Sequence, residues 1–407
     1  MPEMRQLTTA EIDKSLDLSE FAFQYKLSPA ERESKRARTK AEHVWGCFED
    51  GHLASKMTIL PLESVIQGKT FAMGGIASVA TWPEYRHNGF VKRLLTHGLR
   101  VMKEAGQTIS YLVPFSFAYY RKYGWEYITD YKKYTINVHQ LPRHLATSGT
   151  IVRKSKADYS ILKPIYDAYA LRYNGMLKRS DDWWQHNVLR GEKTIAVYFD
   201  VTQKPRGYML YTVKNEEMAI DELIALDEDA RRGLWQFISH HDSMVMKVCL
   251  EAASDDLLPF WLPEPRIKQE VVPHFMGRIV DVAAFIAQYP FNAIGKVSNL
   301  TLNVDDPCAP WNDAVFSIAI DECGKAHVVR VTRQEEGDPK ENNALDGAKS
   351  ERDAQLHTSI QALTALLLGD RRADDLYETG RLHGDAEAVQ CLAQLVPHKT
   401  SYCMDSY

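Results

Sequence analysis

The stretch "YRHNGFVKRLL", residues 85–95, decides the fold because it joins a strand-like segment to a helix. Upstream, "IASVAT" (76–81) has the composition of a β-strand. Downstream, apolar residues recur at helical spacing and Gly106 follows them as a stop signal. The apolar positions of this predicted helix are Phe90, Val91, Leu94, Leu95, Leu99, Val101 and Met102. The sequence therefore predicts a strand–turn–helix unit.

The turn between this strand and helix has the features of a phosphate site. A helix N-terminus exposes unpaired backbone N–H groups and carries partial positive charge, so phosphate binds there readily. Gly89 lets a diphosphate approach the backbone, and Arg86 adds a fixed positive charge. Taken alone, these residues also fit an ordinary basic surface turn, since Arg-x-x-Gly is a common string. The chain has neither G-x-x-x-x-G-K-[ST] nor G-x-G-x-x-G.

Length and composition limit the possible classes. The chain has 407 residues, of which 45% are hydrophobic, and this suits two or three packed domains. Its net charge of −5 argues against a nucleic-acid partner. We expect no membrane span, because there is no run of about 18 apolar residues, and the polar N-terminus lacks a signal-peptide pattern.

The cysteines and histidines point away from disulfides and metals. Six cysteines are scattered without a C-x-x-C pair, which predicts free thiols in a reducing cytoplasm. The run His240-His241-Asp242 lacks a spaced second ligand pair, so we expect no metal site.

Segment patterns divide the chain into three regions, residues 1–148, 149–290 and 291–407. Alternating or continuous apolar runs predict strands at 43–50, 52–66, 74–81, 108–115, 194–200, 206–214, 218–226, 243–251, 297–306, 314–322 and 326–333. Helical spacing predicts helices at 116–125, 159–173, 231–242 and 359–369. The polar stretch 334–352 is predicted to be an exposed loop.

The segment "SVATWPEYRHNGFVKRLLTHGLRVMKEAG" (78–106), followed by "ISYLVPFSFAYYRKYGWEY" (109–127), resembles the GNAT acyltransferases. "RHNGFV" (86–91) matches their acyl-coenzyme A signature, Gln/Arg-x-x-Gly-x-Gly/Ala, except that Val91 replaces a small residue. "YRKYGW" (120–125) matches the family's Tyr-x-[RK]-x-Gly-aromatic segment, in the same order and at the same spacing.

This resemblance implies a site for acetyl-coenzyme A. Its expected contacts are Val79, Ala80 and Thr81 for the pantetheine arm, Arg86, His87, Asn88, Gly89, Phe90 and Val91 for the diphosphate, and Ser116. The resemblance also implies that Tyr120 is the general acid. A phenol has an ordinary pKa near 10, so it stays protonated at neutral pH and can donate to a leaving thiolate. Two alternatives stay open: Tyr120 only packs, or Tyr119 takes its place.

Across nearly the whole chain, the order of segments resembles the enhanced intracellular survival (Eis) acetyltransferases. That group joins two GNAT-type domains to a domain resembling sterol carrier proteins, so the implied fold is of the mixed α+β and α/β class. The resemblance implies a homo-hexamer and direct acetyl transfer to a primary amine. The expected acceptor is a cationic small molecule, aminoglycoside-like or polyamine-like, or a lysine-bearing peptide.

In the Eis group the chain's terminal carboxylate is the catalytic base, which here is that of Tyr407. An aromatic last residue suits this role because its ring could anchor the end in an apolar slot, while a frayed terminus is the ordinary alternative. Asp405 is expected to add negative charge for a cationic substrate. Two further alternatives are a non-catalytic ligand-binding or lipid-binding protein and an enzyme that uses a longer acyl-coenzyme A.

Overall fold

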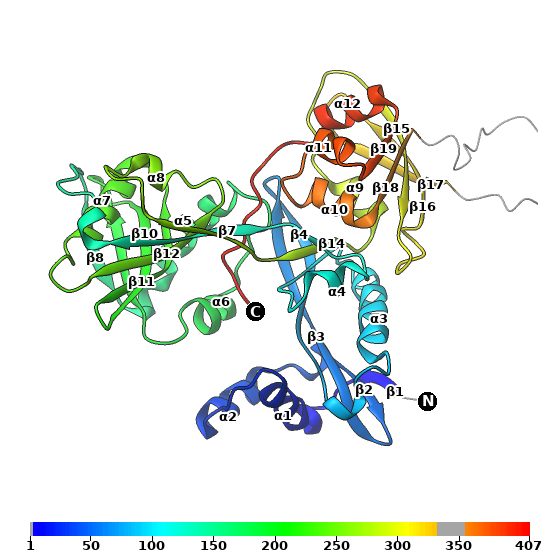
Figure 1. The fold of residues 1–407 in the computed structure, drawn as a ribbon, viewed down its shortest axis with the longest axis horizontal. Helices are drawn as coiled ribbons and strands as arrows, with labels where there is room; N and C mark the ends of the chain where they lie inside the picture. Colours follow the sequence, from blue (N-terminus) through cyan, green and yellow to red (C-terminus); the bar gives the residue numbers. More distant parts are fainter. Residues whose placement is uncertain (1–2, 332–354) are drawn as a thin grey trace, which may run out of the picture.

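A computed structural model of the chain describes residues 3–331 and 355–407. The described residues form three units, each built on one β-sheet (Figure 1). The first two sheets have seven strands each and the third has five. The predicted loop at 334–352 lies outside the described residues. In the described part of the chain, no helix is long and apolar enough to cross a membrane.

The first sheet has the strand order β1-β2-β3-β4-β5-β14-β6. Its strands are β1 (Glu3–Gln6), β2 (Val44–Glu49), β3 (His52–Ile66), β4 (Lys69–Thr81), β5 (Ile109–Leu112), β6 (Glu126–Tyr127) and β14 (Met276–Ile279). Its helices are α1 (Ile12–Ala22), α2 (Pro29–Arg38), α3 (Phe90–Glu104) and α4 (Phe117–Arg121). The predicted helix after the Arg86–Gly89 turn is thus confirmed as α3.

Helices α1 and α3 cover opposite faces of the first sheet. Two neighbouring residues of β3 show this, since successive side chains of a strand point to opposite sides. Met57 points to α3, where it lies directly against Gly98. Lys56 points to α1, and its buried Nζ donates to the carbonyl oxygen of Ser15 (2.6 Å) and to the hydroxyls of Ser15 and Ser19.

The second sheet has the strand order β13-β7-β12-β11-β10-β9-β8. Its strands are β7 (Asp130–Asn137), β8 (Thr150–Lys154), β9 (Thr194–Phe199), β10 (Pro205–Lys214), β11 (Glu217–Ala225), β12 (Lys247–Ala253) and β13 (Lys268–Pro273). Its helices are α5 (Leu162–Ala170), α6 (Asp181–Trp183), α7 (Glu228–Ser239) and α8 (Leu258–Trp261).

The first two units are not divided at a single point in the chain. Strand β7 follows the first unit in the chain but pairs with β12 and β13 of the second sheet. Strand β14 follows the second unit but pairs with β5 and β6 of the first. The second sheet is built from the continuous range 130–273, whereas the first sheet combines residues 3–127 with β14. The ranges 1–148, 149–290 and 291–407 stay a prediction about domains.

The third sheet has the strand order β17-β16-β15-β18-β19. Its strands are β15 (Ser298–Asp305), β16 (Ala314–Ile320), β17 (Ala326–Val331), β18 (Leu356–Ser359) and β19 (Leu382–Gly384). Its helices are α9 (Val282–Gln288), α10 (Ile360–Leu367), α11 (Ala373–Glu378) and α12 (Ala386–Leu395).

After α12 the chain returns to the first two units as a C-terminal tail, residues 396–407. In Figure 1 this tail, drawn in red, runs between the second unit and β4. Asn174 binds it by backbone hydrogen bonds in both directions: its N–H donates to Thr400, and its carbonyl accepts from Tyr402 (2.9 and 2.8 Å).

Candidate active site

The first sheet opens between two of its central strands. Strands β4 and β5 are parallel and pair only over Met73–Gly75 and Ile109–Tyr111. Strand β4 continues to Thr81, and over 76–81 its only described strand partner is β3. One edge of this segment therefore presents backbone groups to a gap, and a linear ligand can pair with such groups.

A β-bulge lies on β4 at this gap. Ser78 and Val79 together stand opposite Met57, because the pairing shifts between Lys56↔Ala80 and Thr58↔Ala77. Ser78 has a φ of 51°, in the left-handed region that non-glycine residues seldom adopt. Bulges of this kind change the direction of a strand and are frequent beside active sites. Nothing in the local sequence signals this bulge, and Ser78 was not predicted as a site residue.

The predicted pantetheine contacts lie next to this bulge. Val79 and Thr81 are half-buried and Ala80 is buried. Ser55 holds the end of the strand: its Oγ donates to the carbonyl oxygen of Ala80 at 3.1 Å and lies 2.8 Å from the Oγ1 of Thr81.

The Arg86–Gly89 turn leads directly into α3. All four of its residues are exposed, and Gly89 adopts a φ of 75° at the position that precedes the helix. No side chain caps the first turn of α3, so its N–H groups face outward without a side-chain acceptor. Buried Phe90 and half-buried Val91 anchor the start of the helix. This geometry fits a diphosphate.

Tyr120 lies on α4 and is only 4% exposed. It shares an apolar cluster with Val79, Phe90 and Val91, so the fold brings these predicted residues together. Burial raises the pKa of its phenol to about 12. In the described part of the chain no hydrogen bond engages its hydroxyl, which is therefore a protonated donor available to a ligand. Ser116 has a structural role here, because its Oγ accepts the N–H of Tyr119 at the start of α4.

A buried ion pair holds the end of α4. The guanidinium of Arg278 donates to the carbonyl oxygen of Tyr123 at 2.5 Å and to both carboxylate oxygens of Asp306 at 2.8 and 2.7 Å. Both charged side chains are fully buried. Gly124 makes room for this contact: a Cβ there would lie 1.3 Å from Nη1 of Arg278. The third unit thus supports the helix that carries Tyr120.

The ring of Tyr407 lies at the start of the gap. A Cβ on Gly75 would lie 2.9 Å from this ring, and the ring packs against Phe275 and Trp183 at centroid distances of 5.6 and 6.0 Å. Its hydroxyl is 4.0 Å from the sulfur of Met73, and burial raises the pKa of this phenol well above its ordinary value. No hydrogen bond or ring contact joins Tyr407 to Tyr120 in the residues that the structure describes.

Asp405 is buried rather than presented to a substrate, so its predicted role is wrong. Its carboxylate accepts the Nε of Arg179 (2.9 and 3.1 Å), the Nε1 of Trp183 (2.7 Å) and the hydroxyl of Tyr166 (3.1 Å). Arg179 also donates to Glu222 at 2.6 Å. Burial opposes the charge of Arg179, yet the two carboxylates hold its pKa above the ordinary value. This network fastens the tail, so the chain end is not frayed.

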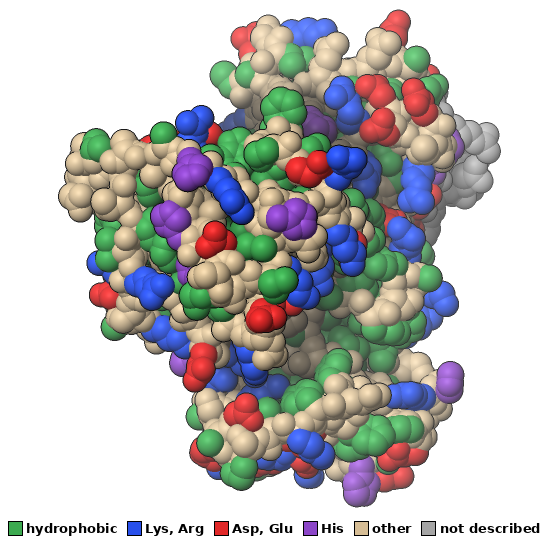
Figure 2. Space-filling view, turned by 60° about the vertical axis from the view of Figure 1, so that its left-hand side comes forward, with side chains coloured by type: hydrophobic (Ala, Val, Ile, Leu, Met, Phe, Trp, Pro, Cys, Tyr) green, Lys and Arg blue, Asp and Glu red, His purple; other side chains and the backbone are tan. Residues whose placement is uncertain are grey.

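The space beside these groups opens to solvent. Figure 2 shows the surface hollowed between the body of the second unit and the lower lobe that carries α1 and α2. An aromatic side chain of this lobe reaches the segment that precedes the Arg86–Gly89 turn. Phe21 of α1 is 50% exposed, and its ring packs on that of Trp82 with 4.9 Å between the ring centroids. An organic acceptor therefore has apolar surface available beside the gap.

Comparison with known proteins identifies the three units. Residues 3–128 match the family model "Acetyltransferase (GNAT) domain". Residues 175–279 match a second model with the same description, and residues 282–404 match "Sterol carrier protein domain". The predicted fold class, two GNAT-type domains followed by a sterol-carrier-like domain, is confirmed.

Known proteins are similar to this chain over most or all of its length. A protein from Streptomyces griseus, described as an uncharacterized N-acetyltransferase, is 24% identical over 83% of this chain and 82% of its own. A solved structure from Enterococcus faecalis V583, described as a probable N-acyltransferase, is 28% identical over the full length of both chains, with a TM-score of 0.90. Eis1 from Mycobacterium abscessus is 18% identical over both full lengths with a TM-score of 0.77, which shows a shared fold. The chain therefore consists of two GNAT acetyltransferase domains followed by a sterol carrier protein domain, and it is an N-acetyltransferase.

Proposed function

We propose that this chain is an Eis-type enzyme that transfers the acetyl group of acetyl-coenzyme A to a primary amine. The observation that carries the proposal is the gap between β4 and β5, which opens beside the uncapped N-terminus of α3. GNAT acetyltransferases use acetyl-coenzyme A, and a strand edge followed by a phosphate-binding turn suits its pantetheine and diphosphate.

In the proposed complex, the backbone of Val79, Ala80 and Thr81 binds the pantetheine arm. The amides at the start of α3, with the charge of Arg86, bind the diphosphate. Amides at the bulge of β4 polarise the thioester carbonyl, which stabilises the negative charge that develops on its oxygen.

Transfer then follows in one displacement. The neutral amine attacks the thioester carbon, the carbon–sulfur bond breaks, and the acetyl group becomes an amide. The hydroxyl of Tyr120 donates its proton to the departing thiolate, for which its raised pKa keeps it protonated. The terminal carboxylate of Tyr407 accepts the proton that the amine loses. Its ring, packed against Phe275 and Trp183, anchors that carboxylate near the gap.

The acceptor class follows from the same site. The terminal carboxylate supplies negative charge, and exposed Phe21 supplies apolar surface, so a cationic organic amine fits. We propose an aminoglycoside-like or polyamine-like molecule, or a lysine-bearing peptide. From the Eis resemblance we further propose a homo-hexamer in the cytoplasm, and the six free thiols suit a reducing compartment.

The test is a matched pair of variants, Tyr120→Phe and Tyr119→Phe, assayed by release of free coenzyme A. The amines are spermidine, an aminoglycoside and a lysine peptide, with acetyl-, propionyl- and longer acyl-coenzyme A as donors. Tyr120→Phe should lower kcat by about 10²–10⁴-fold, because it removes only the proton donor, while the Kd for acetyl-coenzyme A holds.

The opposite pattern, an active Tyr120→Phe and an inactive Tyr119→Phe, would assign the acid to Tyr119. Faster turnover with a longer acyl donor would replace acetyl by that group. Absence of coenzyme A release with every amine would favour the ligand-binding alternative.

A further inference from the structure

The second sheet contains a gap of the same kind as the first. Strands β11 and β12 are parallel and pair only over Glu217–Ile220 and Lys247–Leu250. Strand β11 then continues to Ala225 without β12 beside it. A cavity of about 510 Å³, a size typical of small-molecule sites, opens where these strands separate.

This second cavity does not suit a diphosphate. In place of the open turn before α3, the carboxylate of Asp227 caps α7 by accepting the N–H of Ala230 at 2.9 Å. Glu228 and Asp229 follow in the first turn of the helix. The Asp227 carboxylate therefore already occupies the positive pole of this helix, and two more carboxylates lie in the first turn, where they disfavour phosphate. A ligand of different charge is therefore expected.

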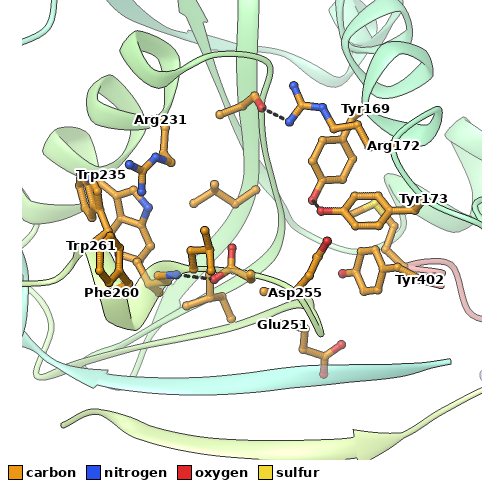
Figure 3. Close-up of a pocket in the computed structure, with 18 residues that line it drawn as sticks. Tyr169, Arg172, Tyr173, Arg231, Trp235, Glu251, Asp255, Phe260, Trp261 and Tyr402 are labelled. Carbon is orange, nitrogen blue, oxygen red and sulfur yellow. Dashed lines mark hydrogen bonds between the residues drawn. The ribbon is translucent and has the colours of Figure 1, made fainter. Parts of the chain in front are cut away.

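Aromatic rings form two facing walls of the cavity (Figure 3). Trp235, Trp261 and Phe260 lie on one side, and Tyr169, Tyr173 and Tyr402 lie on the other. Phe260 is 90% exposed. The faces of such rings carry negative potential, so an organic cation between them is attracted to both walls.

The positive side chains of the cavity are already engaged. Arg172 donates both terminal nitrogens to carbonyl oxygens, those of Ala225 (3.2 Å) and Leu226 (2.7 Å). Arg231 pairs with Glu228 at 2.6 Å and lies over the ring of Trp261, 4.3 Å from its centroid. Neither guanidinium is therefore directed at a bound anion.

Two groups of the cavity, one carboxylate and one hydroxyl, can still form interactions with a ligand. In the described residues Asp255 has no ion pair. The neighbouring Asp256 carboxylate accepts the N–H of Leu258 at 2.9 Å, and burial raises its pKa although nearby Lys132 opposes that shift. Tyr402 is only 3% exposed, yet no hydrogen bond within the described chain engages its hydroxyl, which points into the cavity in Figure 3. A buried hydroxyl without a protein partner indicates that a ligand or water completes it.

We propose that this cavity is a binding site for a small organic cation, an alkylammonium compound held between the two aromatic walls. Asp255 supplies the opposite charge and the hydroxyl of Tyr402 supplies a hydrogen bond. The site is separate from the acetyl-transfer gap of the first sheet and does not depend on the proposed reaction. It is nevertheless built partly from the C-terminal tail, because Tyr402 precedes Tyr407 on the same segment.

The experiment compares choline with 3,3-dimethylbutan-1-ol, its uncharged isostere, by calorimetric titration of the full chain without acetyl-coenzyme A. Neither compound has an N–H, so neither can be an amine acceptor. Choline should bind one site per chain, and the isostere should bind about 2- to 30-fold more weakly, the range that cation–π attraction supports.

The variants locate the binding. Asp255→Asn should weaken choline binding several-fold, and Tyr402→Phe should weaken it while the aromatic wall is retained. Asp242→Asn removes the same charge from an exposed position outside the cavity and should leave binding unchanged. Equal affinity for the two compounds, equal affinity in Asp255→Asn and Asp242→Asn, or no saturable binding of choline would each overturn the proposal.

Discussion

Replacing Asp405 by Asn should release the C-terminal tail and lower turnover. The Asp405 carboxylate accepts hydrogen bonds from three buried donors, on Arg179, Trp183 and Tyr166. An asparagine keeps one acceptor oxygen but turns an NH₂ group toward the same donors, and it removes the negative charge that faces Arg179. Breaking a buried ion pair costs about 3–5 kcal/mol. Because Arg179 keeps Glu222 as a partner, we expect the lower end, about 3 kcal/mol.

That free energy sets the size of the effect on catalysis. About 3 kcal/mol corresponds to roughly a 10²-fold shift between docked and released tail. If the Tyr407 carboxylate is the base, kcat should fall by up to that factor. The Kd for acetyl-coenzyme A should hold, because the Arg86–Gly89 turn is not in contact with the tail.

Three measurements check this prediction: kcat from coenzyme A release, the Kd for acetyl-coenzyme A from calorimetry, and the rate of tail digestion by a carboxypeptidase. The control is Asp374→Asn, which changes an exposed aspartate of α11. Faster digestion with wild-type kcat would show that the docked tail has no role in catalysis. Unchanged digestion together with unchanged kcat would refute the role of Asp405 in holding the tail.

Gly124→Ala should lower both Tm and kcat, because the new Cβ would lie 1.3 Å from Arg278 and break a buried ion pair, which costs about 3–5 kcal/mol. The control is Gly106→Ala, which also lies at positive φ but has nothing within 4 Å of the new Cβ. Equal effects of the two substitutions would point to backbone strain alone. One glycine added after Tyr407 should abolish most turnover at unchanged Tm, because it moves the terminal carboxylate; wild-type kinetics would remove that group from the mechanism. Burial lowers the pKa of Lys56 to about 7 from an ordinary 10.5, so its cost to folding is complete below pH 7 and is relieved as the pH rises toward 10.5. The free energy of unfolding of the wild type relative to Lys56→Met should therefore increase between pH 7 and 9.5 in urea titrations, and a constant difference would show that the amine stays charged.

Several strands could not be predicted because their pattern is set by distant partners. Strand β7 contains Lys132 and Lys133 and lacks a continuous apolar run, yet it lies inside the second sheet between β12 and β13. Strand β14 is four residues long and pairs with β5 more than 160 residues earlier in the chain. The bulge at Ser78 likewise depends on the register with β3, which no local pattern encodes.

The sequence by itself determined the strand–turn–helix unit, because its signals are local. The apolar spacing after Phe90 requires a helix, and Gly89 permits the left-handed backbone that begins it, so both follow from a few neighbouring residues. The order of the domains also followed from the sequence, through the order of recognisable segments.

Only the tertiary structure decided where the charged and terminal residues lie. Asp405 looked like a surface charge, but Arg179, more than 200 residues earlier, neutralises it in the interior. Arg278 is buried because Asp306 of the third unit pairs with it and Gly124 leaves space for it. A buried charge is tolerated only with a partner, and these partners meet through the packing of separate units, which local sequence patterns do not record.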